Sequence, residues 1–173
     1  KDFDFPLFLK PRSSRGGKGA AKVNTAEELE YVFNQIAAEW NQPIIQEYIP
    51  AETGAMHVVG LLYDQCGNLN SSFVCRSLRT NFSWGGGGVV GEPVIKEDIV
   101  KYAVRIVEEL GGWIGPINME FLVDERDGTP TFMEINPRLW GYNYIATMNG
   151  MDLPQKIVRM CQGENVRKQQ NHR

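Results

Sequence analysis

Two short apolar segments joined by an Asp-Gly pair constrain the fold of this chain more than any other feature. Residues 117–123 and 131–135 are rich in residue types that favour strands, and Asp127-Gly128 lies between them. An Asp-Gly pair between two strand-like segments is typical of a β-hairpin. The sequence therefore predicts an antiparallel pair of strands in the last third of the chain.

Two carboxylates and an amide interrupt these apolar strands. Side chains alternate between the two faces of a strand, so Glu120 shares a face with Asn118. On the second strand Glu134 shares a face with Phe132 and Asn136. A carboxylate that faces a core is costly unless it is paired or binds a cation. Because oxygen ligands suit Mg²⁺ or Mn²⁺, we predict a metal site at Glu120, Glu134 and Asn136. The alternative is a sheet whose acids face water.

The length of the turn decides whether the two acids meet. Glu120 lies opposite Glu134 only if the loop has an odd number of residues. A three-residue loop at 126–128, with Gly128 in the left-handed region, meets this condition. A two-residue turn would place Glu120 opposite Ile135 and the acids on opposite faces. We therefore expect the three-residue loop.

A basic, glycine-rich segment lies near the N-terminus. Residues 15–19, Arg-Gly-Gly-Lys-Gly, follow an apolar segment at 5–9 that runs into Lys10. Glycines let backbone N–H groups approach anionic oxygens, and Lys18 adds positive charge. The spacing does not match a Walker A motif. The segment predicts a phosphate-binding loop, although a plain flexible hairpin tip has the same composition.

The remaining pattern combines helices and strands. Thr25 and Glu28 form a capping box before apolar residues at helical spacing, and a second amphipathic helix is expected at 97–110. Asp152 is expected to cap a last helix. Further strands are predicted at residues 20–23, 44–49, 57–63 and 72–78.

This order of elements predicts an α+β fold. Residues 1–50 form a small lobe with a glycine-rich hairpin and a helix. Residues 51–164 form a larger lobe of antiparallel sheet with helices, and 165–173 are a polar, loose tail.

The composition argues against several functional classes. A net charge of −3 does not provide the basic face that general nucleic-acid binding needs. No apolar run approaches the roughly 20 residues of a membrane span. Three cysteines match neither a zinc site nor a disulfide framework, as is typical of a cytoplasmic protein. We therefore expect a cytoplasmic protein without nucleic-acid or membrane partners.

In combination, the two motifs resemble the ATP-grasp superfamily. The resemblance rests on residues 5–19, Phe-Pro-Leu-Phe-Leu-Lys-Pro through Gly-Gly-Lys-Gly, and on residues 133–138, Met-Glu-Ile-Asn-Pro-Arg. Within the superfamily, the chain is similar to carboxylate–amine ligases related to the large subunit of carbamoyl-phosphate synthetase. Such enzymes normally carry a further N-terminal domain, so the resemblance implies that this chain is a fragment.

The resemblance implies a role for several groups of residues. The residues that would contact ATP are Lys10, Gly16, Gly17, Lys18, Gly19, Glu47, Tyr48 and Ile49, with Glu52 or His57 at the ribose. Glu120 and Glu134 would hold two magnesium ions and Asn136 the second of them, while Arg138 and Lys18 would act on the transferred phosphate. The residues near the acceptor substrate would be Arg76, Trp84 and Gly86.

Three of these roles have a simpler alternative. Glu47 could be a surface acid on an edge strand. His57 could be an ordinary strand residue. Arg76 could face solvent.

The activity that the resemblance implies is ATP-dependent ligation. A carboxylate would become an acyl phosphate, and an amine or thiol would then displace phosphate. ATP and Mg²⁺ or Mn²⁺ would be the cofactors, and small-molecule carboxylates and amines the partners; a homodimer is one possible assembly. The alternatives are a kinase-type ATP-grasp phosphotransferase and a non-catalytic nucleotide-binding module.

Overall fold

The computed structural model describes residues 4–51, 54–82 and 85–170. The contacts divide the chain into two compact units. One unit extends to Pro50 and includes Thr80–Gly87, and the other contains Ala51–Arg79 and the chain from Gly88 onward.

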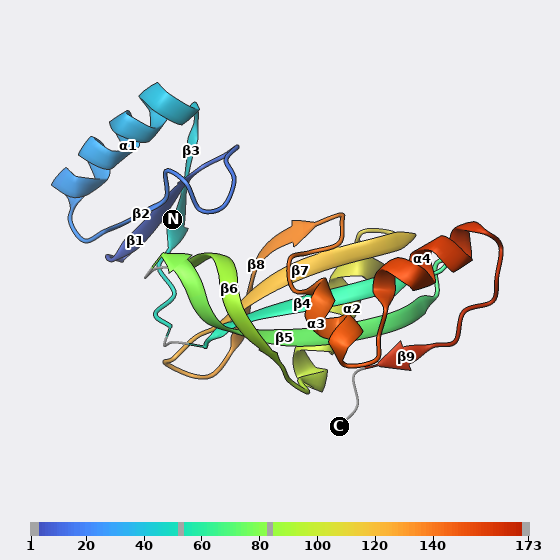
Figure 1. The fold of residues 1–173 in the computed structure, drawn as a ribbon. Coiled ribbons are helices and arrows are strands. Elements are labelled where there is room, and N and C mark those ends of the chain that lie inside the picture. The colour runs from blue at the N-terminus through green and yellow to red at the C-terminus, as the bar shows by residue number, and fades with distance from the viewer. Residues whose placement is uncertain (1–3, 52–53, 83–84, 171–173) are drawn as a thin grey trace. The chain divides into compact units, whose positions relative to one another are not determined.

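The first unit is a three-stranded antiparallel sheet with one helix (Figure 1). Its strands lie in the order β2 (Ala21–Val23), β1 (Leu7–Pro11), β3 (Pro43–Glu47). Helix α1 (Ala26–Trp40) covers one face. The buried side chains between helix and sheet are Leu7, Leu9, Val23 and Ile36. The other face of this small sheet is therefore available for polar residues such as Lys10.

The predicted capping box is present at the start of α1, but the Glu28 carboxylate bonds to the backbone of Asn24 rather than of Thr25. Thr25 Oγ1 accepts a hydrogen bond from Glu28 N at 3.2 Å. The Glu28 carboxylate accepts from Asn24 N at 2.7 Å. Both free N–H groups are thereby satisfied, which is the physical reason such boxes stabilise helix starts.

The second unit contains most of a six-stranded sheet, of which only the strand residues within Thr80–Gly87 belong to the first unit. Its main strands are β4 (Met56–Tyr63), β5 (Leu69–Phe82), β6 (Gly85–Pro93), β7 (Gly115–Val123) and β8 (Pro130–Asn136), in the order β6-β5-β4-β7-β8. A short strand, β9 (Gln169–Gln170), pairs in parallel with β5. The order makes β6 and β8 the lateral strands of the main sheet.

Both faces of this sheet carry a hydrophobic core. Helix α2 (Glu97–Glu109) covers one face, and α3 (Asn143–Met148) and α4 (Leu153–Cys161) cover the other (Figure 1). The α2 core includes Val59, Met119 and Phe121, whereas the opposite core includes Val58 and Phe73. Alternation along β4 and β7 therefore assigns each side chain to one of two packed faces.

Three elements differ from the sequence-based expectation. Strand β6 begins in the glycine run, which favours strands poorly and gave no strand signal. Helix α3 was not predicted. The supposedly loose tail is anchored in part, because Val166 is buried and its carbonyl accepts from Asn70 Nδ2 at 2.8 Å.

None of the helices in the described part of the chain combines the length and apolar character needed to cross a bilayer.

Candidate active site

Glu120 of β7 and Glu134 of β8 are direct partners in the antiparallel ladder, and Asn118 lies opposite Asn136. Met119, between Asn118 and Glu120, is buried in the α2 core. The four polar side chains therefore share the opposite face of the sheet. This confirms the predicted pairing of the two acids on one face.

The turn that produces this pairing differs from the prediction. Asp124 N donates to Thr129 O at 3.0 Å, so residues 125–128 form the turn and the expected three-residue loop is wrong. An irregularity at Met133 then shifts the register. This extra residue, a β-bulge, brings Glu134 opposite Glu120. Gly128 has φ +74°, so its predicted left-handed conformation is confirmed.

The bulge also changes which side chains share a face. Phe132 pairs with Phe121, and their ring centroids lie 5.8 Å apart in an edge-to-face arrangement. Because Phe121 belongs to the α2 core, Phe132 lies on the α2 face. The expectation that Phe132 shares a face with Glu134 is therefore wrong. The bulge separates the aromatic side chain from the acids.

A hydrogen-bond network connects the polar side chains on the acid-bearing face. Asn136 Nδ2 donates to Glu134 Oε1 at 2.9 Å and to Asn118 Oδ1 at 3.2 Å. Arg138 Nη2 donates to Asn136 Oδ1 at 3.2 Å. Asn118 is buried, whereas Glu134 and Arg138 are exposed. The network fixes an amide between a carboxylate and a guanidinium, which suits recognition of an oxyanion.

The donor set is suited to a hard cation only in part. The described residues hold no group of three or more His, Cys, Asp and Glu side chains that could bind a metal ion. Two carboxylates and one amide oxygen leave coordination positions for substrate oxygens and water, as Mg²⁺ in nucleotide sites requires.

Two aromatic residues follow Arg138 on this face, and the sequence analysis did not identify them. The Trp140 ring packs over Gly60, where a Cβ atom would overlap it. The Tyr142 hydroxyl lies 3.1 Å from Ser77 Oγ and donates to Val90 O at 3.1 Å. A lone glycine within a strand of bulky residues is the sequence signal that could have indicated a ring at Gly60.

His57 lies on the other face of the sheet. It is the ladder partner of Phe121, whose side chain is in the α2 core. His57 is buried, and its Nδ1 lies 2.9 Å from Ala55 O. Burial lowers the pKa of this imidazole, outweighing the hydrogen bond with Ala55. The structure does not bring His57 together with Glu120, and its environment is that of an ordinary strand residue.

Arg76 is also on the α2 face, as the ladder partner of His57. Its Nε donates to Glu92 Oε1 at 2.9 Å, and the two side chains form an exposed ion pair. The structure therefore does not bring Arg76 to the acids. Of the other residues expected near substrates, Glu52 and Trp84 lie outside the described residues, and Gly86 lies in β6.

In the first unit, several residues occupy the face of the small sheet that α1 leaves uncovered. Lys10 is half-buried on this face. Phe8 pairs with Lys22 on one side and Gln46 on the other. Lys22 Nζ lies 4.1 Å from the centre of the Tyr48 ring. Gln46 Oε1 is buried and has no hydrogen-bond partner among the described residues. Gln46 was not among the residues expected to contact ATP, although alternation along the strand places it with Lys10 and Phe8.

Glu47 lies on the opposite face of the small sheet. It pairs with Leu7, which packs against α1. Strand β3 ends at Glu47, so Tyr48 and Ile49 follow it rather than belong to it as expected.

The glycine-rich segment forms a defined turn. Gly16, Gly17 and Gly19 have φ values of +60°, +72° and +76°, which L side chains rarely adopt. A Cβ atom on Gly19 would lie 2.8 Å from the ring of Pro11. Lys18 is exposed on this turn.

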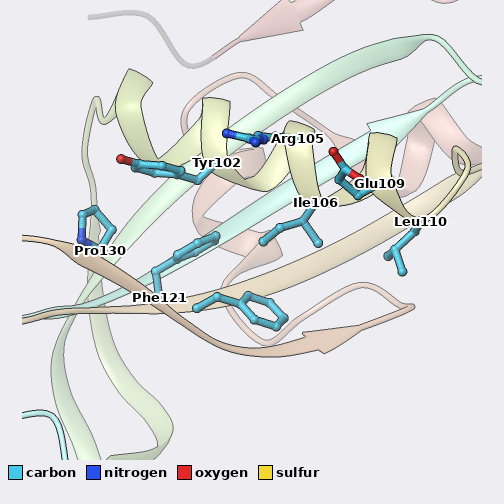
Figure 2. A pocket seen from close by; sticks show the side chains of 8 residues that line it. Tyr102, Arg105, Ile106, Glu109, Leu110, Phe121 and Pro130 are labelled. Carbon is cyan, nitrogen blue, oxygen red and sulfur yellow. The ribbon is translucent and has the colours of Figure 1, made fainter.

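A pocket of about 400 Å³ lies between α2 and the β7–β8 hairpin (Figure 2). Its apolar lining comes from Ile106 of α2, from Leu110 directly after that helix, and from Phe121 and Phe132 of the hairpin. It therefore opens on the α2 face, away from Glu120 and Glu134. We do not assign it to a nucleotide, since nucleotide phosphates need the polar face.

Comparison with known proteins identifies a family over most of the chain. A family model described as an ATP-grasp domain matches residues 4–142. An acetyl-CoA carboxylase from Dictyostelium discoideum is 30% identical over 166 residues, which cover 92% of this chain and 7% of that protein. Pyruvate carboxylase 1 from Caenorhabditis elegans is 26% identical over 179 residues, covering 96% of this chain and 15% of that protein.

Solved structures share the fold. The biotin carboxylase domain of the Hydrogenobacter thermophilus 2-oxoglutarate carboxylase, determined with MgADP, ADP and bicarbonate, has a TM-score of 0.74 and 23% identity. The match covers 97% of this chain and 39% of that chain. A biotin carboxylase–β-γ-ATP complex from Campylobacter jejuni has a TM-score of 0.74 and 20% identity, covering 94% and 38% of the two chains. The predicted ATP-grasp fold is confirmed. The chain spans well under half the length of these relatives.

Proposed function

The chain belongs to the ATP-grasp domain family, and from this premise we propose that it contributes the nucleotide site of an ATP-dependent ligase that activates a carboxylate. The observation that supports this most is the pairing of Glu120 with Glu134, flanked by Asn136 and Arg138. Like charges directly opposite each other in a ladder are destabilising unless a cation or another partner compensates them.

Magnesium is the cation that these residues fit best. Glu120, Glu134 and Asn136 would hold it through oxygen atoms, and the hydrogen bond from Asn136 Nδ2 to Glu134 Oε1 orients the amide. When bound, the ion would neutralise charge on the phosphates of ATP. Arg138 lies next to Asn136 and would hold an oxyanion through its guanidinium.

The nucleotide would be contacted by residues of the first unit. Lys10 and Lys18 would pair with phosphate oxygens, and the turn at Gly16–Gly19 would direct backbone N–H groups at them. The face of the small sheet that carries Lys10 also carries Gln46, whose side-chain oxygen has no hydrogen-bond partner among the described residues. The aromatic ring of Tyr48 lies against Lys22 of the same sheet. We propose that Gln46, in place of Glu47, accepts from the exocyclic amine of adenine. Tyr48 and Ile49 would line the base.

The proposed reaction has two steps. A carboxylate oxygen of the acceptor attacks the γ-phosphorus, the bond to the β-phosphate oxygen breaks, and ADP leaves. A nucleophile, such as an amine nitrogen, then attacks the carbonyl carbon of the acyl phosphate, loses a proton and displaces phosphate. Lys10, Lys18 and Arg138 would position and neutralise the phosphates, and the loop at residues 12–19 would exclude water.

Bicarbonate is one acceptor to consider, because the biotin carboxylase domain from Hydrogenobacter thermophilus was determined with bicarbonate and is described as a dimer. A homodimer is accordingly part of the proposal. The relatives are much longer than this chain. The acceptor and the nucleophile are therefore to be identified with the full-length protein.

The test uses the full-length protein. ADP release with MgATP is measured across carboxylates and amines, with bicarbonate included. Glu134→Gln should abolish acceptor-dependent ADP release while the protein stays folded, and Lys18→Ala should raise the ATP concentration required. Glu125→Gln, in the exposed turn of the same hairpin, is the matched control and should keep activity.

Normal turnover by Glu134→Gln would refute the metal assignment. A stable phosphorylated product without an amine step would favour the kinase-type reaction. ATP binding without ADP formation would favour a nucleotide-binding module.

A further inference from the structure

Residues 137–142, here called the crossing segment, connect the end of β8 to the start of α3. Its two aromatic side chains contact glycines on different strands: Trp140 packs on Gly60 of β4, and Tyr142 packs on Gly88 of β6. Because the strand order is β6-β5-β4-β7-β8, the segment crosses the acid-bearing face from one lateral strand to the other. The residue that reaches β6 is Tyr142.

The Tyr142 hydroxyl bonds to two strands at once. It donates to the carbonyl oxygen of Val90 in β6 at 3.1 Å. The Ser77 hydroxyl of β5 also lies 3.1 Å from the Tyr142 oxygen, and the single Ser77 proton is shared between this contact and the carbonyl oxygen of Arg79 at 3.3 Å. The hydroxyl therefore links the chain that carries Arg138 to both β5 and β6. A phenylalanine would fill the same volume without this link.

The backbone of β6 is shaped to admit this ring. A Cβ atom on Gly88 would overlap the Tyr142 hydroxyl, and one on Gly91 would lie 3.0 Å from Tyr142 Cζ. Val89 and Val90, between these glycines, are 60% and 40% exposed. The contact between β6 and the crossing segment thus depends on Tyr142 rather than on buried valines.

Tyr142 is also electrostatically near the acids. Burial raises the pKa of its phenol, and the negative charge of Glu120 adds to the increase, against the hydrogen bond with Ser77. The phenol therefore stays protonated and keeps its bond with Val90 O at neutral pH. A neutral hydroxyl that joins two strands is suited to positioning rather than to proton transfer.

We propose that Tyr142 is a positioning residue that fixes strand β6 to the crossing segment that carries Arg138 and thereby shapes the acceptor side of the site. This inference rests on the proposed function. Strand β6 contains Gly86, which the resemblance places near the acceptor. When the hydroxyl is lost, β6 should remain in the sheet through β5 but move more freely relative to Glu120. The acceptor should then bind less well, whereas ATP should not.

The test compares Tyr142→Phe with the wild-type full-length protein. The acceptor is bicarbonate or, if another carboxylate gives more ADP release in the screen above, that carboxylate. We expect the KM for the acceptor to rise about five- to tenfold, the range that one lost hydrogen bond supports, with the KM for ATP unchanged. Amide hydrogen exchange at Val89–Gly91 should accelerate by a similar factor. Tyr144→Phe, which changes a 68% exposed tyrosine two residues further on, is the matched control.

A second comparison isolates the contact itself. Gly88→Ala should mimic Tyr142→Phe or exceed it, whereas in a Tyr142→Ala background Gly88→Ala should add nothing further to the acceptor KM. An unchanged acceptor KM in Tyr142→Phe, or an equal rise in both KM values, would overturn the inference while leaving the ligase proposal intact. A wild-type protein without acceptor-dependent ADP release would instead refute the proposed function, and the inference with it.

Discussion

Glu120 lies directly opposite Glu134 because Met133 is an extra residue in strand β8. Near the turn the pairs are Phe121 with Phe132 and Val123 with Pro130, and beyond the bulge they are Glu120 with Glu134. The bulge therefore sends the aromatic side chain of Phe132 to the α2 core and the carboxylate of Glu134 to the opposite face.

Deletion of Met133 should convert β8 into a regular strand without moving Glu134 from its partner. The pairs on either side of the bulge would then follow one another in a continuous ladder. We expect the full-length variant to keep the rise in melting temperature that MgADP causes, because the acids still share a face. Thermal unfolding with and without MgADP measures this.

Asn136→Ala is the comparison for the deletion. It keeps the register but removes the amide oxygen that we propose as a metal ligand and the hydrogen bond with Glu134. It should weaken MgADP binding on the order of 10-fold or more, as is usual when a metal site loses a supporting partner. If the Met133 deletion weakened MgADP binding as much as Asn136→Ala, the bulge itself would be required.

The sequence predicted the acid hairpin but not how it is built. Alternation along Ile117–Val123 assigned Glu120 to one face correctly, because a strand with a packed face has little freedom of register. Nothing distinguishes Met133 as a bulge, since both Phe132 and Met133 are apolar and fit either face. The turn is one residue longer than predicted, and the bulge adds one unpredicted residue to β8. The two differences compensate each other, so Glu134 still lies opposite Glu120.

Two residues assigned by resemblance, one to the ribose and one to the acceptor substrate, do not share a face with the acids. His57 and Arg76 are partners of each other on the α2 face. Their position follows from the register of β4 against β7, in which Val58 lies opposite Glu120. Such a register between strands that are far apart in the chain cannot be read from local patterns. Gln46 differs, because alternation within β3 alone separates it from Glu47.

Gln46→Leu should weaken ATP binding. The Gln46 side-chain oxygen is buried and finds no hydrogen-bond partner in the part of the chain that the structure describes, whereas Glu47 lies on the α1 face. A single hydrogen bond to adenine supports about a three- to tenfold loss of affinity. Titration calorimetry of the full-length protein with MgATP measures it.

Glu47→Gln is the matched control for Gln46→Leu and should bind MgATP with unchanged affinity. Binding of MgGTP, which lacks the exocyclic amine at that ring position, should be insensitive to Gln46→Leu. A loss of ATP affinity in Glu47→Gln, with Gln46→Leu unaffected, would return the adenine contact to Glu47.

Gly60→Ala should destabilise the second unit. A Cβ atom at Gly60 would overlap the ring of Trp140, which is 4% exposed and packs among Val58 and Phe73. Overpacking of this kind costs about 1–3 kcal/mol. Urea unfolding should therefore show a lower midpoint.

Gly141→Ala provides the control, because a Cβ atom there meets no atom within 4 Å. Its effect on the free energy of unfolding should stay within about 0.5 kcal/mol. Equal effects of the two substitutions would show that the overlap with Trp140 does not determine stability.

The stability of the second unit should fall below neutral pH through His57. Burial lowers the pKa of this imidazole in the folded state below its ordinary value of 6.5, so the unfolded chain binds the proton more readily. The contribution of neutral His57 to the free energy of unfolding is therefore complete above pH 6.5. It is lost as the pH falls towards the pKa of His57 in the folded state. Across that window the free energy of unfolding should decrease by at most about 1.4 kcal/mol per pH unit.

His57→Gln removes this titration while retaining a polar side chain that can donate to Ala55 O. Urea unfolding of both proteins between pH 7.5 and pH 5 should therefore give curves that diverge at high pH and converge as the pH falls, because only the wild type loses stability through the imidazole. Buried carboxylates whose pKa is lowered, such as Asp124, act at lower pH and are common to both proteins. Parallel curves would mean that His57 takes up its proton equally well in the folded and unfolded states, and its burial in β4 would then have to be less complete than the fold indicates.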